Sequence, residues 1–156
     1  MEVPVLAVRQ PWAGLIAAGL KTWEVRNYPA PEKHLGQKIA IYASRTNPEA
    51  DDLHHVSLRR FLYDFNIQNP DPTSLPSPCF KFGEIVAVAT LETYQRCENS
   101  LDFSYREPKH WAPLSYHKDG KTHFWSLAHI QAPKHPIPFK FPRGSVVWTS
   151  TELETI

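Results

Sequence analysis

The sequence contains few cysteines and no long apolar run. Cys79 and Cys97 are its only cysteines among 156 residues, and neither belongs to a CxxC pair. Two widely separated thiols are typical of free cysteines in a reducing compartment rather than of a disulfide framework. No run of about 18 apolar residues is present to span a membrane, and the start of the chain has neither a basic leader nor a small-residue cleavage site. We therefore expect a soluble, cytoplasmic protein with no membrane partner.

The chain also lacks an excess of positive charge and the common catalytic signatures. Its formal net charge is +1, which excludes the strongly basic surface that grips duplex nucleic acid through many phosphates. The sequence has no GxSxG, GxGxxG or HExxH motif and no complete phosphate loop, and its eight histidines follow no known ligand spacing. No metal and no cofactor is therefore predicted, and a small ligand or a short single strand is the expected partner.

The remaining composition is that of one globular domain covering residues 1–156, with 42% hydrophobic and 21% charged residues. Hydrophobic periodicity and proline positions divide it into short elements. The predicted strands cover 4–8, 21–26, 38–44, 84–93, 124–129 and 144–149; the predicted helices cover 11–18, 48–65 and 99–106; and 69–78 is a proline-rich loop. This succession predicts an α+β fold, a partly closed barrel of five to six strands with flanking helices.

The apolar phase of each predicted element gives a predicted core. The helix at 11–18 has apolar residues at i, i+3 and i+4 and ends at a glycine, Gly19, that suits a left-handed cap. The residues predicted to be buried are Trp12, Leu15, Ile16, Ile39, Ile41, Val86, Val88 and Val146.

The most informative segment is RQPWAGLIAAGLKTWEVR, residues 9–26. A strand places alternate side chains on one face, so Thr22, Glu24 and Arg26 share a face. One interpretation is a solvated sheet face with cross-strand ion pairs. The other is a polar cleft beside the helix start at residues 10–12, whose free N–H groups would attract an anion.

The order LAVRQPWAGLIAAGLKTWEVR, IAIYAS, FGEIVAVATL, FWSL and PIPFKFPRG, which spans nearly the whole chain, resembles the ASCH domain family. The resemblance implies a PUA-like β-barrel with a cleft beside the Lys-Thr-x-Glu-x-Arg strand, and ligands that are RNA or nucleosides. Some small members are amidohydrolases that remove acyl groups from the N4 amine of cytidine. Others resemble RNA-binding or nuclease modules.

The same resemblance makes Lys21 an activating base and Arg26 a cation of the cleft. In the smallest bacterial amidohydrolases a nucleophilic threonine stands at the position that Glu24 holds here, so the resemblance implies a different mechanism for this chain. A carboxylate could activate water, while Lys21 could stabilise the oxyanion or exchange protons with the leaving nitrogen. The predicted catalytic residues are Lys21, Glu24 and Thr22.

A cytosine base also needs an aromatic face and polar groups along its edge. Two functions follow: an amidohydrolase acting on N4-acylcytidine-type nucleosides such as N4-acetylcytidine, or a noncatalytic RNA-binding or ribonuclease-like module that holds single-stranded RNA. The predicted binding residues are Arg9, Gln10, Trp12, Arg26, Ser44, Trp111 and Tyr116. Each of the aromatic residues also has a simpler interpretation as part of the core.

Overall fold

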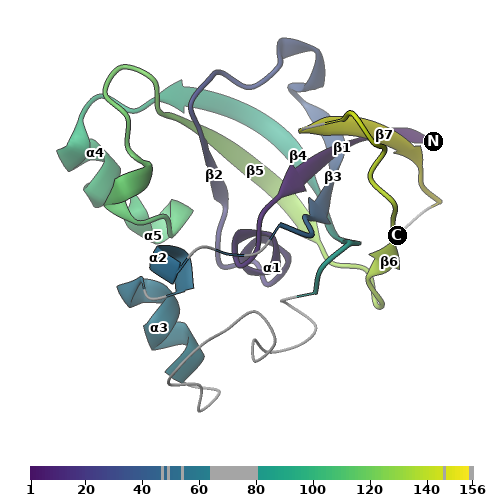
Figure 1. The fold of residues 1–156 in the computed structure, drawn as a ribbon. Coiled ribbons are helices and arrows are strands. Elements are labelled where there is room, and N and C mark those ends of the chain that lie inside the picture. The colour runs from purple at the N-terminus through teal and green to yellow at the C-terminus, as the bar shows by residue number, and fades with distance from the viewer. Residues whose placement is uncertain (47, 49, 54, 64–80, 146, 155–156) are drawn as a thin grey trace.

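The protein, analysed as a computed structural model, is built on one mixed sheet of seven strands (Figure 1). The structure describes residues 1–46, 48, 50–53, 55–63, 81–145 and 147–154. The strands are β1 (Glu2–Val8), β2 (Trp23–Arg26), β3 (Gln37–Ala43), β4 (Glu84–Arg96), β5 (His123–Gln131), β6 (Ile137–Pro138) and β7 (Trp148–Glu152). Their order is β2-β5-β4-β3-β1-β7, with β6 paired to β4. The α+β class and the partly closed sheet are confirmed, and the number of strands exceeds the predicted five to six.

Helices flank this sheet. Figure 1 shows α1, seen nearly end-on, beside the curved sheet, and the later helices grouped on one side, away from β7 and the chain ends. None of the described helices is long and apolar enough to cross a membrane. The helices are α1 (Trp12–Ala17), α2 (Ala50–Leu53), α3 (Val56–Tyr63), α4 (Ser100–Tyr105) and α5 (Glu107–His110), with short 3-10 turns η1 (Glu32–His34) and η2 (Leu114–Tyr116).

Several elements differ from the sequence prediction. The helix predicted over 48–65 is two helices, α2 and α3, while residues 64–80, including the predicted loop and Cys79, lie outside the described residues. The last strand begins at Trp148 instead of 144, because a turn closed by the Ser145 N–H and the Pro142 carbonyl (3.1 Å) precedes it. The two-residue strand β6 was missed, since it lies in a proline-rich run that reads as loop.

The core lies between α1 and the sheet. The helix turns Trp12, Leu15 and Ile16 inward, and Gly19 ends it at φ 76°, the left-handed conformation that its sequence predicted. The core prediction is confirmed for every member that the structure describes, each at most 6% exposed, and Val146 lies outside the described residues. The confirmed residues are Trp12, Leu15, Ile16, Ile39, Ile41, Val86 and Val88.

Replacing Ile41 by alanine is expected to lower the free energy of unfolding by about 2–5 kcal/mol. Ile41 is fully buried in β3 and lies between Leu6 of β1 and Ala87 of β4, so truncation leaves a cavity between three strands. Leu101→Ala is the matched control, because Leu101 is 78% exposed on α4 and should change stability by less than about 0.5 kcal/mol. Urea unfolding of both variants checks the prediction. Equal losses would show that β3 is not central to the core.

Candidate functional site

The short strand β2 brings two charged side chains into the interior of the fold. It pairs antiparallel with β5, and its alternation turns Trp23 and Val25 toward Phe124 on one face while Glu24 and Arg26 point to the other. Glu24 is only 5% exposed. The interpretation of this face as solvated is therefore wrong, and the shared face of Glu24 and Arg26 lines a cavity.

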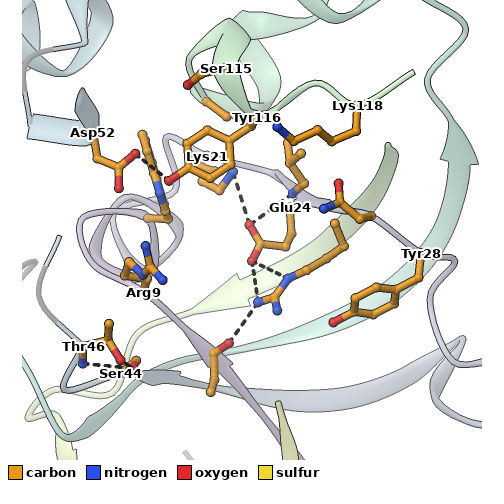
Figure 2. Close-up of a pocket in the computed structure, with 16 residues that line it drawn as sticks. Arg9, Lys21, Glu24, Tyr28, Ser44, Thr46, Asp52, Ser115, Tyr116 and Lys118 are labelled. Carbon is orange, nitrogen blue, oxygen red and sulfur yellow. Dashed lines mark hydrogen bonds and ion pairs between the residues drawn. The ribbon is translucent and has the colours of Figure 1, made fainter. Parts of the chain in front are cut away.

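Glu24 is the centre of a buried ion cluster (Figure 2). Its Oε2 accepts two hydrogen bonds from Arg26, from Nε at 3.1 Å and from Nη2 at 2.8 Å. Its Oε1 lies 3.4 Å from Nζ of Lys21, whose side chain is 1% exposed. The Nη2 of Arg26 also donates to the carbonyl of Ala7 (2.9 Å). Lys21 and Arg26 therefore share one carboxylate. Its negative charge compensates their positive charges in a place where water does not solvate them.

The buried residue His110 provides a hydrogen-bond acceptor for Lys21. Lys21 Nζ donates to the backbone carbonyl of His110 at 2.5 Å. The imidazole Nε2 of His110 donates to the Phe103 carbonyl (2.8 Å), and Nδ1 accepts from the Ala112 N–H (3.0 Å). Burial lowers the pKa of His110 to about 4, so the ring is neutral with its proton on Nε2. The His110 side chain thus fixes the end of α5, where its own carbonyl is the acceptor for Lys21.

Burial and mutual attraction act differently on the two central groups. Burial lowers the pKa of Lys21 to about 8, although the neighbouring Glu24 partly offsets the shift. Burial alone would raise the pKa of Glu24, but the charges of Arg26 and Lys21 together hold it below its ordinary value. Glu24 is consequently a weak base, and Lys21 changes its protonation close to neutral pH. The arrangement favours Lys21 as the group that exchanges protons.

These groups lie on the wall of a cavity of about 680 Å³. In Figure 2, Asp52 and Tyr116 lie on one side of the ion cluster and Tyr28 lies on the opposite side. The cavity is lined by Ala7, Arg9, Trp12, Lys21, Glu24, Val25, Arg26, Asn27, Tyr28, Ser44, Thr46, Asp52, Ala112, Ser115, Tyr116 and Lys118. Its volume falls in the range of sites for ligands of drug or nucleoside size.

Most of the residues predicted from sequence are brought together here. Those that line the cavity are Lys21, Glu24, Arg26, Arg9, Trp12, Ser44 and Tyr116. Thr22 does not line it. Instead, the Thr22 N–H donates to the Lys109 carbonyl (3.0 Å) and its carbonyl accepts from the Leu127 N–H (2.8 Å), so Thr22 joins β2 to its neighbours through the backbone.

Two of the predicted binding residues, Gln10 and Trp111, also lie outside the cavity lining. Gln10 is fully buried; its Oε1 accepts from the Gly14 N–H (2.8 Å) and its Nε2 donates to the Lys81 carbonyl (2.7 Å). Trp111 packs edge-on against Phe61, with ring centroids 6.1 Å apart. The Gln10 amide therefore anchors the start of α1, and the Trp111 ring packs beside α3.

The predicted anion site at the start of α1 is wrong. The N–H groups of Trp12 and Ala13 both donate to the Arg9 carbonyl, at 3.0 and 3.3 Å. The next N–H, that of Gly14, is taken by the Gln10 side chain. With these donors occupied by the chain itself, the helix start offers them to no ligand.

Asp52 was not found by sequence reasoning. It is 1% exposed, and its carboxylate accepts a 2.5 Å hydrogen bond from the hydroxyl of Tyr116. Burial and this carboxylate raise the pKa of the Tyr116 hydroxyl well above its usual range, so the hydroxyl stays protonated. The two residues are 64 positions apart, and no local pattern signals their contact. The other lining residues with polar side chains that sequence reasoning missed are Asn27, Tyr28, Thr46, Ser115 and Lys118.

The fold and the cavity together define an α+β domain whose open sheet holds an ion-paired polar site. The chain belongs to the ASCH domain family, because the family model matches residues 6–118. This match includes the whole ion cluster and the loop up to Lys118.

Solved structures agree with this assignment. The ASCH protein of Zymomonas mobilis is similar over 97% of this chain and 87% of its own, with 18% identity and a TM-score of 0.56. A serine-to-alanine variant gives 17% identity and a TM-score of 0.56 over the same shares. A tyrosine-to-phenylalanine variant gives 18% and 0.55 over 97% and 89%. No curated protein sequence matches the chain. At such identities the likeness supports the fold alone.

Proposed function

We propose that the protein is an amidohydrolase that removes the acyl group from N4-acylcytidine-type nucleosides. The observation that carries the proposal is the buried Lys21, with a pKa of about 8, held on the wall of a cavity of nucleoside size. A strongly shifted lysine with a specific charge partner in a cleft is a common feature of catalytic sites. The ASCH family resemblance supplies the class of substrate.

In the proposed mechanism, neutral Lys21 is the general base. In the neutral amine, the two N–H groups of Lys21 point to the His110 carbonyl and the Glu24 carboxylate. The lone pair of the nitrogen is left to accept the proton. Lys21 takes a proton from water as the water oxygen attacks the acyl carbon. The resulting ammonium then gives that proton to the cytosine N4 as the C–N bond breaks, releasing cytidine and a carboxylic acid.

Glu24 and Arg26 have supporting roles in this mechanism. Glu24 stabilises the Lys21 ammonium while it holds the transferred proton, because its Oε1 lies 3.4 Å from Nζ. Arg26 lines the same cavity and carries a permanent positive charge, which favours the negative charge that develops on the acyl oxygen. The carboxylate therefore acts through Lys21 instead of activating water itself.

The base would bind between the aromatic and polar walls. Tyr116 lies edge-on to Trp12 at 6.1 Å, and Tyr28, 40% exposed, lies across the cavity. Their rings offer aromatic faces for stacking. The Asn27 amide and the Ser44 hydroxyl offer donors and acceptors for the edge of the base.

The pH dependence of hydrolysis tests the role of Lys21. Because only the neutral amine accepts a proton, kcat/KM for N4-acetylcytidine is expected to rise about tenfold per pH unit below the Lys21 pKa of about 8 and to level off above it. Steady-state rates from pH 6 to pH 9.5 measure this profile. A kcat/KM that falls as pH rises through 8 would mean that the ammonium is the active form, and it would contradict the mechanism.

A further inference from the structure

The cavity has more positive than negative groups on its wall. Four basic side chains line it, Arg9, Lys21, Arg26 and Lys118, against two acidic ones, Glu24 and Asp52. An excess of positive charge remains when Lys21 is neutral. The entire chain has a formal net charge of only +1, so the residues outside the cavity together carry a slight negative charge and the positive excess lies at the cavity.

The two acidic groups are already engaged within the protein. Glu24 is held by Arg26 and Lys21, and the carboxylate of Asp52 accepts from the Tyr116 hydroxyl. Neither needs a cation from the ligand. A bound molecule with negative charge would instead compensate the positive excess.

Lys118 is the basic residue placed to contact such a molecule. It lies on the exposed rim of the cavity, and Figure 2 shows its ammonium end turned toward the side of Tyr116. Within the described parts of the chain, its ammonium forms no hydrogen bond or ion pair. A cation at this position can meet an anionic group of the ligand without first breaking an internal pair.

The backbone of Lys118 is held in place although its side chain is on the rim. The buried Thr122 accepts from the Lys118 N–H through Oγ1 at 2.7 Å and donates to the Lys118 carbonyl at 3.3 Å. The N–H groups of Lys121 and Thr122 also donate to that carbonyl, at 3.0 and 3.1 Å. This turn fixes where the side chain begins, which reduces the entropy lost when the ammonium binds.

We infer that the natural substrate is a phosphorylated N4-acylcytidine, whose phosphate is contacted by the ammonium of Lys118. The inference rests on the proposed function, because it assigns a substrate class to the same cavity. A phosphate monoester carries the negative charge that the wall lacks, and a lysine at the rim meets the phosphate while the acylated base reaches Lys21.

The test compares kcat/KM for N4-acetylcytidine, its 5′-monophosphate, its 3′-monophosphate and a short single-stranded oligoribonucleotide with one N4-acetylcytidine. A charge-assisted contact should favour a phosphorylated substrate by about tenfold to a hundredfold over the nucleoside. Lys118→Met should bring this ratio close to one, and Lys118→Arg should retain most of it. The matched control is Lys121→Met, which removes the same charge from an exposed residue outside the cavity lining and should leave the ratio unchanged.

The outcomes separate this inference from the proposed function. Preference for either monophosphate supports the inference and identifies a free nucleotide as the source of the phosphate. Preference for the oligoribonucleotide over both monophosphates supports the inference and identifies RNA as the source. Hydrolysis of all four substrates at similar kcat/KM overturns the inference and leaves the proposed function standing. A preference that survives in Lys118→Met also overturns it. Absence of turnover on all four, and on the same substrates with other acyl groups, overturns both.

Discussion

Replacing Lys21 by methionine is expected to lower kcat for N4-acetylcytidine hydrolysis by about 10²–10⁴-fold, the usual contribution of a general base. Methionine keeps an unbranched side chain in the buried position but cannot accept a proton. Steady-state kinetics at pH 8 measure the loss. Lys33→Met is the matched control, since Lys33 lies in the exposed turn η1 and outside the cavity lining. Full activity in Lys21→Met would show that another group activates the water.

Stability measured against pH shows whether Lys21→Met acts by losing the buried amine. The folded-state pKa of Lys21, about 8, is lower than its ordinary value of 10.5, so between these values the unfolded chain binds more protons than the folded one. The contribution of Lys21 to the free energy of unfolding therefore rises with pH across this window. The free energy of unfolding of Lys21→Met should lack this part of the rise with pH. An identical pH dependence in both proteins would contradict the burial of a titrating lysine.

Glu24→Gln is expected to cause the largest loss of stability among the site variants, about 3–5 kcal/mol. The substitution leaves the buried charges of Arg26 and Lys21 without the carboxylate that both contact. Urea unfolding measures the loss. Glu92→Gln makes the same change on the exposed face of β4 and is the matched control. Equal stabilities of the two variants would show that the ion cluster contributes nothing to the fold.

The same variant separates the roles of the two groups in catalysis. Glu24 raises the pKa of Lys21, so its removal should move the midpoint of the kcat/KM profile below pH 8. Glu24→Gln should also keep more activity than Lys21→Met when both are compared below their unfolding transitions. If Glu24→Gln instead loses the full general-base contribution with an unshifted midpoint, the carboxylate is the base, as the sequence first suggested.

Much of the fold was predictable because its elements carry strong local patterns. The apolar spacing of residues 11–18, followed by Gly19, predicted the first helix. Alternation in β3 and an apolar run on both faces of β4 predicted buried strands. What failed depends on distant partners. The strand β6 consists of two residues that pair with β4, and β7 starts where pairing with β1 allows. Such registers are set by tertiary contacts rather than by local propensity.

The candidate site was predictable in its centre and not at its edges. Period two along β2 placed Glu24 and Arg26 on one face, and the structure brings Lys21 to the same carboxylate. The sequence could not show how deeply these groups are buried, and burial decides which of them titrates near neutral pH. It also gave no sign of Asp52 or Lys118, because their places at the cavity depend on packing between segments far apart in the chain.

The central claim is tested most directly by incubating the purified wild-type protein with N4-acetylcytidine at pH 8 and following cytidine and acetate by chromatography. This pH lies close to the pKa of Lys21, about 8, so the neutral amine is available. We expect equimolar release of both products, catalytic in protein, and release slower by at least about a hundredfold with Lys21→Met prepared in the same way. No release of cytidine from N4-acetylcytidine or from substrates with several other acyl groups, whether phosphorylated or not, would contradict it.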